Sequence, residues 1–211
     1  MKLLDKFRYF KNNTKERKKI QDIIDKLPDN ETIAKEILAE NNNTKTKIVL
    51  DEEIKNSYYI FLNDTIYLSN KNKASTRYSR LCLIAHECKH SLQSKVLQVI
   101  NFLISNIELI FFVLFAILGL LNFKNSFIPN IYYITVILSI IPRLILEFDA
   151  VYSSVRISEK YVEQKLSKDE ADIVHLVYSF QVKVLVPMLV FSLVIWKAIR
   201  SIIIFVIYKY V

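Results

Sequence analysis

Cysteine is scarce in this sequence, and its spacing excludes the short cysteine motifs of redox and zinc sites. Cys82 and Cys88 are the only two cysteines among the 211 residues. Six positions separate them, which is not the C-x-x-C spacing, and on one helix this separation does not place the two side chains on adjacent turns. We therefore expect two reduced thiols in a region that faces the cytoplasm.

Signatures of nucleic-acid binding and of a cleaved leader are also missing. The formal net charge is +8, but the basic residues are interspersed with acidic ones and match no RNA- or DNA-binding motif, so we expect no nucleic-acid partner. Attraction to anionic lipid headgroups explains the charge more simply. The first 19 residues carry charges where a signal peptide needs an unbroken apolar stretch, and we expect no cleaved targeting sequence.

Apolar residues, by contrast, are abundant and unevenly distributed. They make up 52% of the chain, whereas 19 of the 29 Lys and Arg lie in the first 95 residues. Three long apolar segments follow, at residues 96–121, 127–146 and 182–210. At ~1.5 Å of rise per residue, each can cross a hydrocarbon core of ~30 Å. The sequence therefore predicts a mainly α-helical membrane protein with a polar first half.

Charged residues inside the apolar segments limit how these segments lie in a bilayer. Lys197 and Arg200 fall within the third segment, where a centred charge is costly unless it snorkels or pairs. Two paths stay open: one crossing that ends near Trp196 with an interfacial tail, and a single tilted crossing. Glu108 lies inside the first segment, and we expect it to face Arg143 or a neighbouring subunit.

A helical metal-binding pattern lies just before the first apolar segment. His86-Glu87-Cys88-Lys89-His90 fits H-E-x-x-H, in which residues i and i+4 share one helix face, so both imidazoles can bind one Zn²⁺. Glu87 then lies beside the open position, where a carboxylate can accept a proton from zinc-bound water and pass it to a leaving amine. Gln93 lies on the same face and could support a ligand or the substrate.

The same pattern has a plain alternative, because two histidines and an acid on a helix are often only a solvated face. Two observations favour the metal site. His86 and His90 are two of only three histidines in the chain, and apolar residues 81 and 83–85 lead directly into the motif, so the helix should be half buried. Cys88 faces away from the two histidines, and we expect it to be buried rather than to bind metal.

A third protein ligand must return to the same membrane face, and Glu147 is the candidate. It opens the stretch EFDA immediately after the second apolar segment, so a membrane hairpin would bring its carboxylate back to the histidines. The alternative, an acid at a membrane end that faces water, stays open. Asp149 is better placed to hold the second ring nitrogen of a ligating histidine. His175 and Tyr178 are either stabilisers of a reaction oxyanion or, as we expect, packed or interfacial side chains.

With these motifs the sequence resembles a family of neutral zinc metallopeptidases, which are multi-pass bacterial membrane proteins, over approximately residues 31–193. The stretches ETIAKEILAEN, YLS, AHECKHSLQ and EFDA carry the resemblance. In that family the two motif histidines and the glutamate of the E-F-[DN]-A segment are taken as zinc ligands, and the motif glutamate as the catalytic base. The resemblance thus implies one Zn²⁺ held by His86, His90 and Glu147, with Glu87 as the base.

Three departures from the family pattern are visible. Members usually begin with a membrane-crossing segment, which we do not expect in this chain. They favour a Val-Gly pair where this chain has Cys88 and Lys89, which leaves the packing behind the zinc helix open because a glycine allows close backbone approach. Val151 replaces a small polar residue after EFDA. None of these differences removes a proposed ligand.

We divide the chain into five parts on this basis. The divisions are a basic helix (1–28, on the membrane or on the soluble region), a cytoplasmic zincin-like α+β region with a short sheet and the H-E-x-x-H helix (29–95), a transmembrane hairpin (96–146), a third-ligand connector (147–181) and a membrane segment (182–211). Within the second part we predict a helix after Asp29, a strand at 47–50, two strands around a two-residue turn at 63–64, and a helix from 74 to about 97.

Two hypotheses for function follow from the sequence. The first is a multi-pass cell-membrane zinc metalloendopeptidase whose site faces the cytoplasm, as the positive-inside rule predicts, and whose partners are lipid and a free or membrane-bound peptide or protein substrate. The second is a non-catalytic membrane protein that keeps the fold and acts as an immunity, assembly or regulatory partner. Oligomerisation is compatible with either hypothesis.

Overall fold

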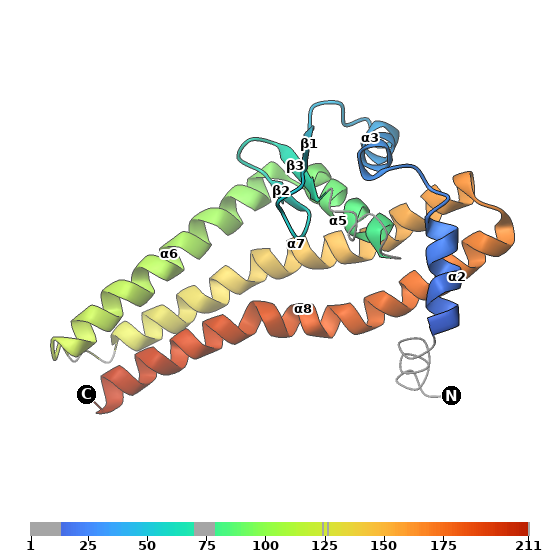
Figure 1. Cartoon of the computed structure of the whole chain (residues 1–211). Helices are drawn as coiled ribbons and strands as arrows, with labels where there is room; N and C mark the ends of the chain where they lie inside the picture. Colours follow the sequence, from blue (N-terminus) through green and yellow to red (C-terminus); the bar gives the residue numbers. More distant parts are fainter. Residues whose placement is uncertain (1–13, 70–78, 124, 126, 211) are drawn as a thin grey trace. The chain divides into compact units, whose positions relative to one another are not determined.

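The computed structural model describes residues 14–69, 79–123, 125 and 127–210, and within them the protein is mainly helical with one small sheet (Figure 1). The chain forms two compact units. The first contains residues up to Leu92 together with Asp149–Val184, and the second contains Gln93–Phe148 together with Leu185–Val211. The predicted basic N-terminal helix is confirmed only as α2 (Thr14–Ile24), because residues 1–13 lie outside the described residues.

The helix predicted after Asp29 is present as α3 (Asn30–Glu40). Asp29 caps its N-terminus, since a side-chain oxygen accepts a hydrogen bond from the backbone N–H of Thr32 at 2.9 Å. This bond satisfies one of the backbone donors that a helix start leaves without a partner and lowers the pKa of the Asp29 carboxyl. At the other end, Asn41 follows as the C-cap residue, as predicted.

A three-stranded sheet follows α3, in the order β1-β3-β2. The strand β1 (Lys47–Asp51) pairs in parallel with β3 (Thr65–Ser69), which pairs antiparallel with β2 (Tyr58–Ile60). The sheet was predicted, but the two-residue turn was not correct. Strand β2 ends at Ile60, and a four-residue turn leads to β3, with Asp64 at a positive φ of 49°, a conformation that Asp tolerates better than most residues.

The H-E-x-x-H motif lies on α5 (Arg80–Leu92). The predicted single helix from 74 to about 97 is wrong at its C-terminal end, and its first residues lie outside the described part of the chain. Helix α5 ends at Leu92, and α6 (Lys95–Leu120) begins after Ser94, whose hydroxyl accepts from Leu97 N–H at 3.4 Å. Serine favours this capping position over a helix interior, which explains the break.

Helix α5 packs its apolar face into the first unit. Its buried residues recur at a spacing of three and four, and they lie against α3. Arg80 at the helix start is 5% exposed and donates to the backbone oxygens of Ile24, Leu27 and Pro28 at 2.8 to 2.9 Å. The Ile24 carbonyl belongs to the last residue of α2 and the other two follow it, in the region where a helix leaves its acceptors unsatisfied. A single side chain thus ties the end of α2 to α5.

Both cysteines are free, as predicted, and both are buried, which was predicted for Cys88 alone. Burial raises the pKa of the Cys82 and Cys88 thiols, and the charge of Glu87 adds to the effect at Cys88. Because the thiolate is the reactive form, we expect neither thiol to react with a maleimide in the native protein near neutral pH, and both to react after unfolding, as counted by mass spectrometry. Rapid labelling of the native protein would contradict this placement.

The raised thiol pKa also predicts a pH dependence of stability. The folded state holds these protons more tightly than the unfolded state, so this contribution to stability is complete below the unfolded thiol pKa of ~8.5 and declines as the pH rises above it. A urea unfolding series across this range measures the effect. Substituting both cysteines with alanine should lower stability overall but flatten the decline above that pH.

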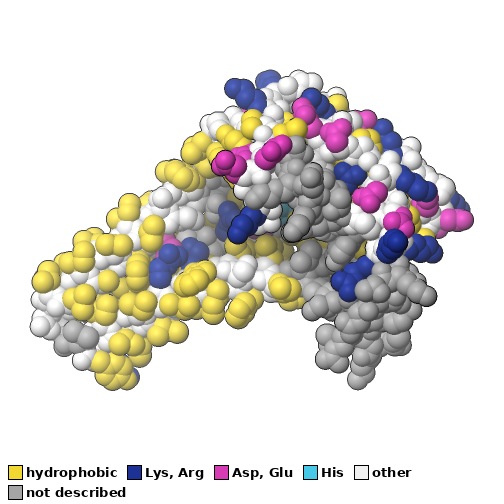
Figure 2. Space-filling model, viewed as in Figure 1, with side chains coloured by type: hydrophobic (Ala, Val, Ile, Leu, Met, Phe, Trp, Pro, Cys, Tyr) yellow, Lys and Arg dark blue, Asp and Glu magenta, His cyan; other side chains and the backbone are white. Residues whose placement is uncertain are grey.

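The second unit contains α6 and parts of two longer helices, α7 (Phe127–Lys165) and α8 (Lys168–Tyr210). Two stretches are long and apolar enough to cross a membrane, Lys95–Leu120 and Val186–Tyr210. Only 11% and 6% of their most apolar windows are buried, unlike the core helix of a soluble protein. Hydrophobic side chains cover the visible face of these helices (Figure 2). The crossing predicted at 127–146 and the cytoplasmic side of the site stay predictions.

Glu108 on α6 is the centre of a buried ionic cluster in the second unit. Its carboxylate is 1% exposed and accepts hydrogen bonds from Lys197 at 3.0 Å, Arg200 at 2.9 Å and the Tyr132 hydroxyl at 2.7 Å. The two cations of α8 therefore both pair with Glu108, and the path of the third apolar segment stays a prediction. Arg143, the partner we expected for Glu108, forms an ion pair with Glu147 instead.

Gly119, the only glycine in the chain, allows α6 and α8 to approach closely within the second unit. A Cβ at this position would lie 2.5 Å from Ile207 Cγ2 and 2.8 Å from the Tyr208 ring. That ring cannot move freely, because its hydroxyl donates to Phe115 O at 3.0 Å. We expect Gly119→Ala to destabilise the protein by ~1–3 kcal/mol through overpacking, which outweighs the ~1 kcal/mol that alanine gains in helix propensity.

Thermal unfolding in detergent measures the effect of Gly119→Ala. Val113→Ala, a change at an exposed position of the same helix, controls for a small substitution in α6 away from this contact. A Gly119→Ala protein at least as stable as wild type would show that the helices do not pack here.

Candidate metal centre

The two motif histidines lie on one face of α5, at the edge of its buried stripe. Ala85 and Cys88 are fully buried, whereas His86 and His90 are partly exposed. The Nε2 atoms of the two rings are 3.1 Å apart, and the rings meet edge to face. Two nitrogens bound to a tetrahedral zinc at ~2.05 Å would be ~3.3 Å apart. The spacing therefore matches that of two ligands of one ion.

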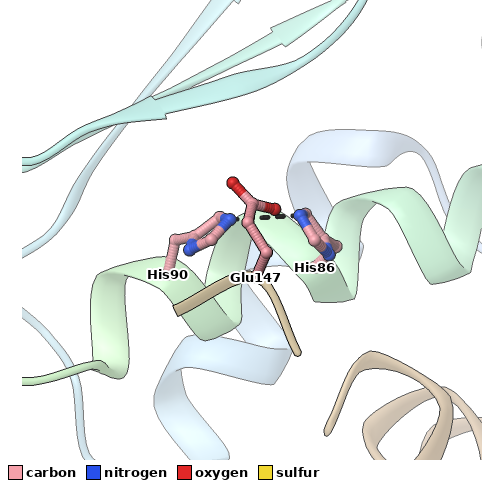
Figure 3. A group of neighbouring side chains, drawn as sticks. All are labelled: His86, His90 and Glu147. Carbon is pink, nitrogen blue, oxygen red and sulfur yellow. Dashed lines mark hydrogen bonds between the residues drawn. The ribbon is translucent and has the colours of Figure 1, made fainter. Parts of the chain in front are cut away.

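Glu147 completes the group. One ligand atom from each of His86, His90 and Glu147 lies within 4.8 Å of the others. In Figure 3 the carboxylate, which comes from α7, points between the two imidazole rings. Two neutral imidazoles and one carboxylate are the donor set of a zinc site with three protein ligands, which keeps a fourth position open. The predicted trio is thus confirmed as a group that could hold a metal ion.

The neighbours of Glu147 fix the position of its side chain. Glu147 is 5% exposed, and one of its oxygens pairs with Arg143 Nη2 at 2.6 Å, one helical turn earlier on α7. Gln93 donates its amide to Leu146 O at 2.7 Å, which ties the start of α6 to α7 beside Glu147. The prediction that Gln93 supports a ligand is consistent with this bond, because it fixes the backbone that carries Glu147.

Asp149 holds α7 against α5 in the first unit. Its carboxylate pairs with Lys89 at 3.2 Å and accepts from Ser153 at 3.2 Å. Lys89 stands where the zinc metallopeptidases that the sequence resembles favour glycine. Its ammonium group is held by the ion pair with Asp149. The predicted role of Asp149, to hold the second nitrogen of a histidine, stays a prediction.

Glu87, the predicted base, follows His86 directly on α5 and is partly exposed. It borders a cavity that extends along α5 toward Arg80. A partly exposed carboxylate with access to a cavity can exchange a proton with water or with a substrate group. Its position next to the histidine ligands is the one that the motif requires.

The structure does not bring His175 to this group. Its Nε2 lies 3.4 Å from the backbone oxygen of Glu159, twelve residues after Glu147 on α7, or ~18 Å along the helix at ~1.5 Å per residue. Tyr178 is completely buried. Both placements fit packed side chains, and a role of either residue at an oxyanion stays a prediction. Cys88 is fully buried with Sγ directed at Ala34 O at 3.9 Å, as expected for a residue that does not bind metal.

Two functional neighbours were missed from the sequence. Arg143 lies four residues before Glu147, a spacing that places oppositely charged side chains together on a helix, so this ion pair could have been found. The pairing of Lys89 with Asp149 depends on how α5 and α7 pack in the first unit, and no local pattern indicates it.

Comparisons of this chain with family models, with curated proteins and with solved structures gave no match.

Proposed function

We propose that this protein is a membrane-anchored zinc metalloendopeptidase. The observation that carries the proposal is the convergence of His86, His90 and Glu147, whose ligand atoms lie within 4.8 Å of one another. Two residues come from one turn of α5 and the third from α7, so the trio is not a local accident of one helix. The resemblance to zinc metallopeptidases in the H-E-x-x-H and EFDA stretches supports the same assignment.

Different residues of the chain would have different roles in peptide hydrolysis. Zn²⁺ in such a site supplies Lewis acidity and lowers the pKa of bound water toward neutrality. Glu87 would take a proton from the attacking water and deliver it to the leaving amine. Arg143 and Gln93 would keep the Glu147 side chain in place, as partners behind a metal ligand generally do.

We place the site at the cytoplasmic surface of the cell membrane in this proposal. The support is the concentration of Lys and Arg in the first 95 residues and the two helices that are long and apolar enough to span a bilayer. Substrates would then be peptides near or delivered by the membrane. These two helices would make the protein multi-pass, and residues 127–146 would add a third crossing.

The second hypothesis, a non-catalytic immunity, assembly or regulatory partner that keeps the same fold, also has an observation in its favour. The candidate ligands satisfy one another without an ion: His86 and His90 are within hydrogen-bond distance of each other, and Glu147 pairs with Arg143. Such a network could stabilise the fold by itself.

A cleavage assay separates the two hypotheses. Full-length protein in detergent or liposomes would be stripped with a chelator, reloaded with Zn²⁺ and incubated with a fluorogenic peptide library. We expect cleavage that is lost with the chelator and restored by zinc, because every step needs the ion. Protein that folds normally, binds zinc and cleaves nothing would contradict the enzyme and favour the partner.

A further inference from the structure

A small cavity in the first unit lies beside Glu87. Its lining includes Arg80, Ile84 and Glu87 of α5, and also Ser57 before β2 and Ser69 at the end of β3. Seven residues separate Arg80 from Glu87, which is ~10 Å along the helix. The cavity thus leads from the proposed catalytic carboxylate to a buried cation.

The size of the cavity limits its occupant. Its volume is about 100 Å³, less than the ~150 Å³ of a cavity that accepts benzene. An aromatic side chain is therefore too large, while a short chain of one or two methylenes with a small polar head fits. Leu83 and Ile84 supply the apolar surface for the methylenes.

Arg80 gives this cavity a positive charge that forms no ion pair within the described residues; the carboxylates of Asp25 and Asp29 act on it only as nearby charges, which raise its pKa. Its Nη atoms donate to three backbone oxygens and to the amide oxygen of Asn30 at 3.1 Å, and all four acceptors are neutral. Its buried Nε has no hydrogen-bond partner in the described parts of the chain. Burial lowers the pKa of Arg80, but a guanidinium stays protonated near neutral pH.

Two further donors border the same cavity. Lys55 is exposed and lines it, and so does Ser57. The Ser57 hydroxyl accepts from Ser69 N–H at 3.0 Å, and a hydroxyl that accepts still has its own hydrogen to donate. Among the described residues that line the cavity, Glu87 is the acid, and in the proposed function it lies on the side of the reacting bond. An ammonium group, a guanidinium N–H and a hydroxyl together suit a carboxylate.

We propose that this cavity is the pocket that selects the substrate, and that it takes the side chain of a glutamate or aspartate next to the cleaved bond. The inference rests on the proposed peptidase function, because it places the reacting carbonyl near Glu87. The acidic side chain would extend along Leu83 and Ile84 toward Arg80 and Lys55. An unbranched neutral side chain of the same size would fit but lose the charged contact, and a lysine side chain would be repelled.

Binding measurements test this inference separately from catalysis. Three acetylated peptides that differ only in one residue, Glu, Gln or Lys, would carry a hydroxamate beside that residue and be titrated into the zinc-loaded full chain in detergent. We expect the Glu peptide to bind about tenfold more tightly than the Gln peptide, because charge-assisted hydrogen bonds are stronger than neutral ones. The Lys peptide should bind least.

Charge reversal at the pocket provides the matched comparison. Lys55→Glu should remove the preference for Glu over Gln, whereas Lys45→Glu, the same change at an exposed residue that does not line the cavity, should keep it. Equal binding of the Glu and Gln peptides, or a preference that survives Lys55→Glu, would overturn the inference.

The outcomes also separate the pocket from the enzyme. The Glu peptide could bind more tightly than the Gln peptide although no peptide is cleaved. If peptides with an amide in place of the hydroxamate show the same preference on metal-free protein, the result would support the pocket and contradict the peptidase. Cleavage of library peptides with no preference for acidic residues would support the peptidase and overturn the pocket. No binding by any hydroxamate peptide would overturn both.

Discussion

The Glu87→Gln protein is expected to bind zinc as wild type does and to lose peptide cleavage by about 10²–10⁴-fold, the usual contribution of a positioned general base. The amide keeps the shape of the side chain on α5 but cannot take a proton from water. Glu87 is not among the three residues whose ligand atoms converge, so zinc content should not change. The rate constant kcat for a fluorogenic peptide, measured with zinc content on the same sample, gives both quantities.

A matched control is Glu52→Gln, the same chemical change at an exposed residue of the first unit. It should cleave at the wild-type rate. Wild-type cleavage by the Glu87→Gln protein would remove Glu87 from the mechanism. Loss of zinc together with activity would instead make Glu87 a ligand and contradict the assignment of roles.

The Glu108→Gln protein should lose about 3–5 kcal/mol of unfolding free energy, the scale for breaking a buried ion pair by removing one partner. The carboxylate is 1% exposed and contacts both Lys197 and Arg200. Without it, the two cations would remain close together in an apolar helical unit with no opposing charge among their described contacts. Chemical unfolding in mild detergent, followed by circular dichroism, measures the loss.

A triple variant keeps this prediction testable even where the single variant fails to fold. Glu108→Leu, Lys197→Met and Arg200→Met together remove all three charges and restore apolar packing, which is often neutral or stabilising in place of a buried ionic group. We expect it to regain most of the lost stability. A single variant as stable as wild type, or a triple variant no better than the single, would show that the cluster does not hold α8 to α6.

Local chemistry made much of this fold predictable. Asp29 predicts the start of α3 because its side chain can cap the first turn, and the β-branched and aromatic residues before α5 indicate a sheet. The H-E-x-x-H spacing predicts two histidines on one helix face, and the structure places their nitrogens 3.1 Å apart. The cap and the histidine pair are decided by residues within about one helical turn of one another, whereas the sheet also joins strands that lie up to eighteen residues apart in register.

The features that could not be predicted from the sequence depend mostly on residues that lie far apart along the chain. The break between α5 and α6 was missed for two reasons. Serine has a low helix propensity but does occur inside helices, and the apolar periodicity continues across Ser94. The partners of Glu108 come from α8, about ninety positions later, and any of several cations satisfied the same electrostatic argument. The cavity beside Glu87 involves α5, β3 and the residues before β2, and only their packing creates it.

The most direct test of the metal centre is the zinc content of purified full-length protein, measured by inductively coupled plasma mass spectrometry with the X-ray absorption spectrum of the bound ion. We predict one zinc per chain with two imidazole nitrogens and a carboxylate oxygen. Glu147→Ala should weaken zinc binding strongly, while Glu163→Ala, an exposed acid farther along the same helix, should not. Full zinc occupancy with an unchanged spectrum in Glu147→Ala, or a folded wild-type protein that binds no zinc, would contradict the account.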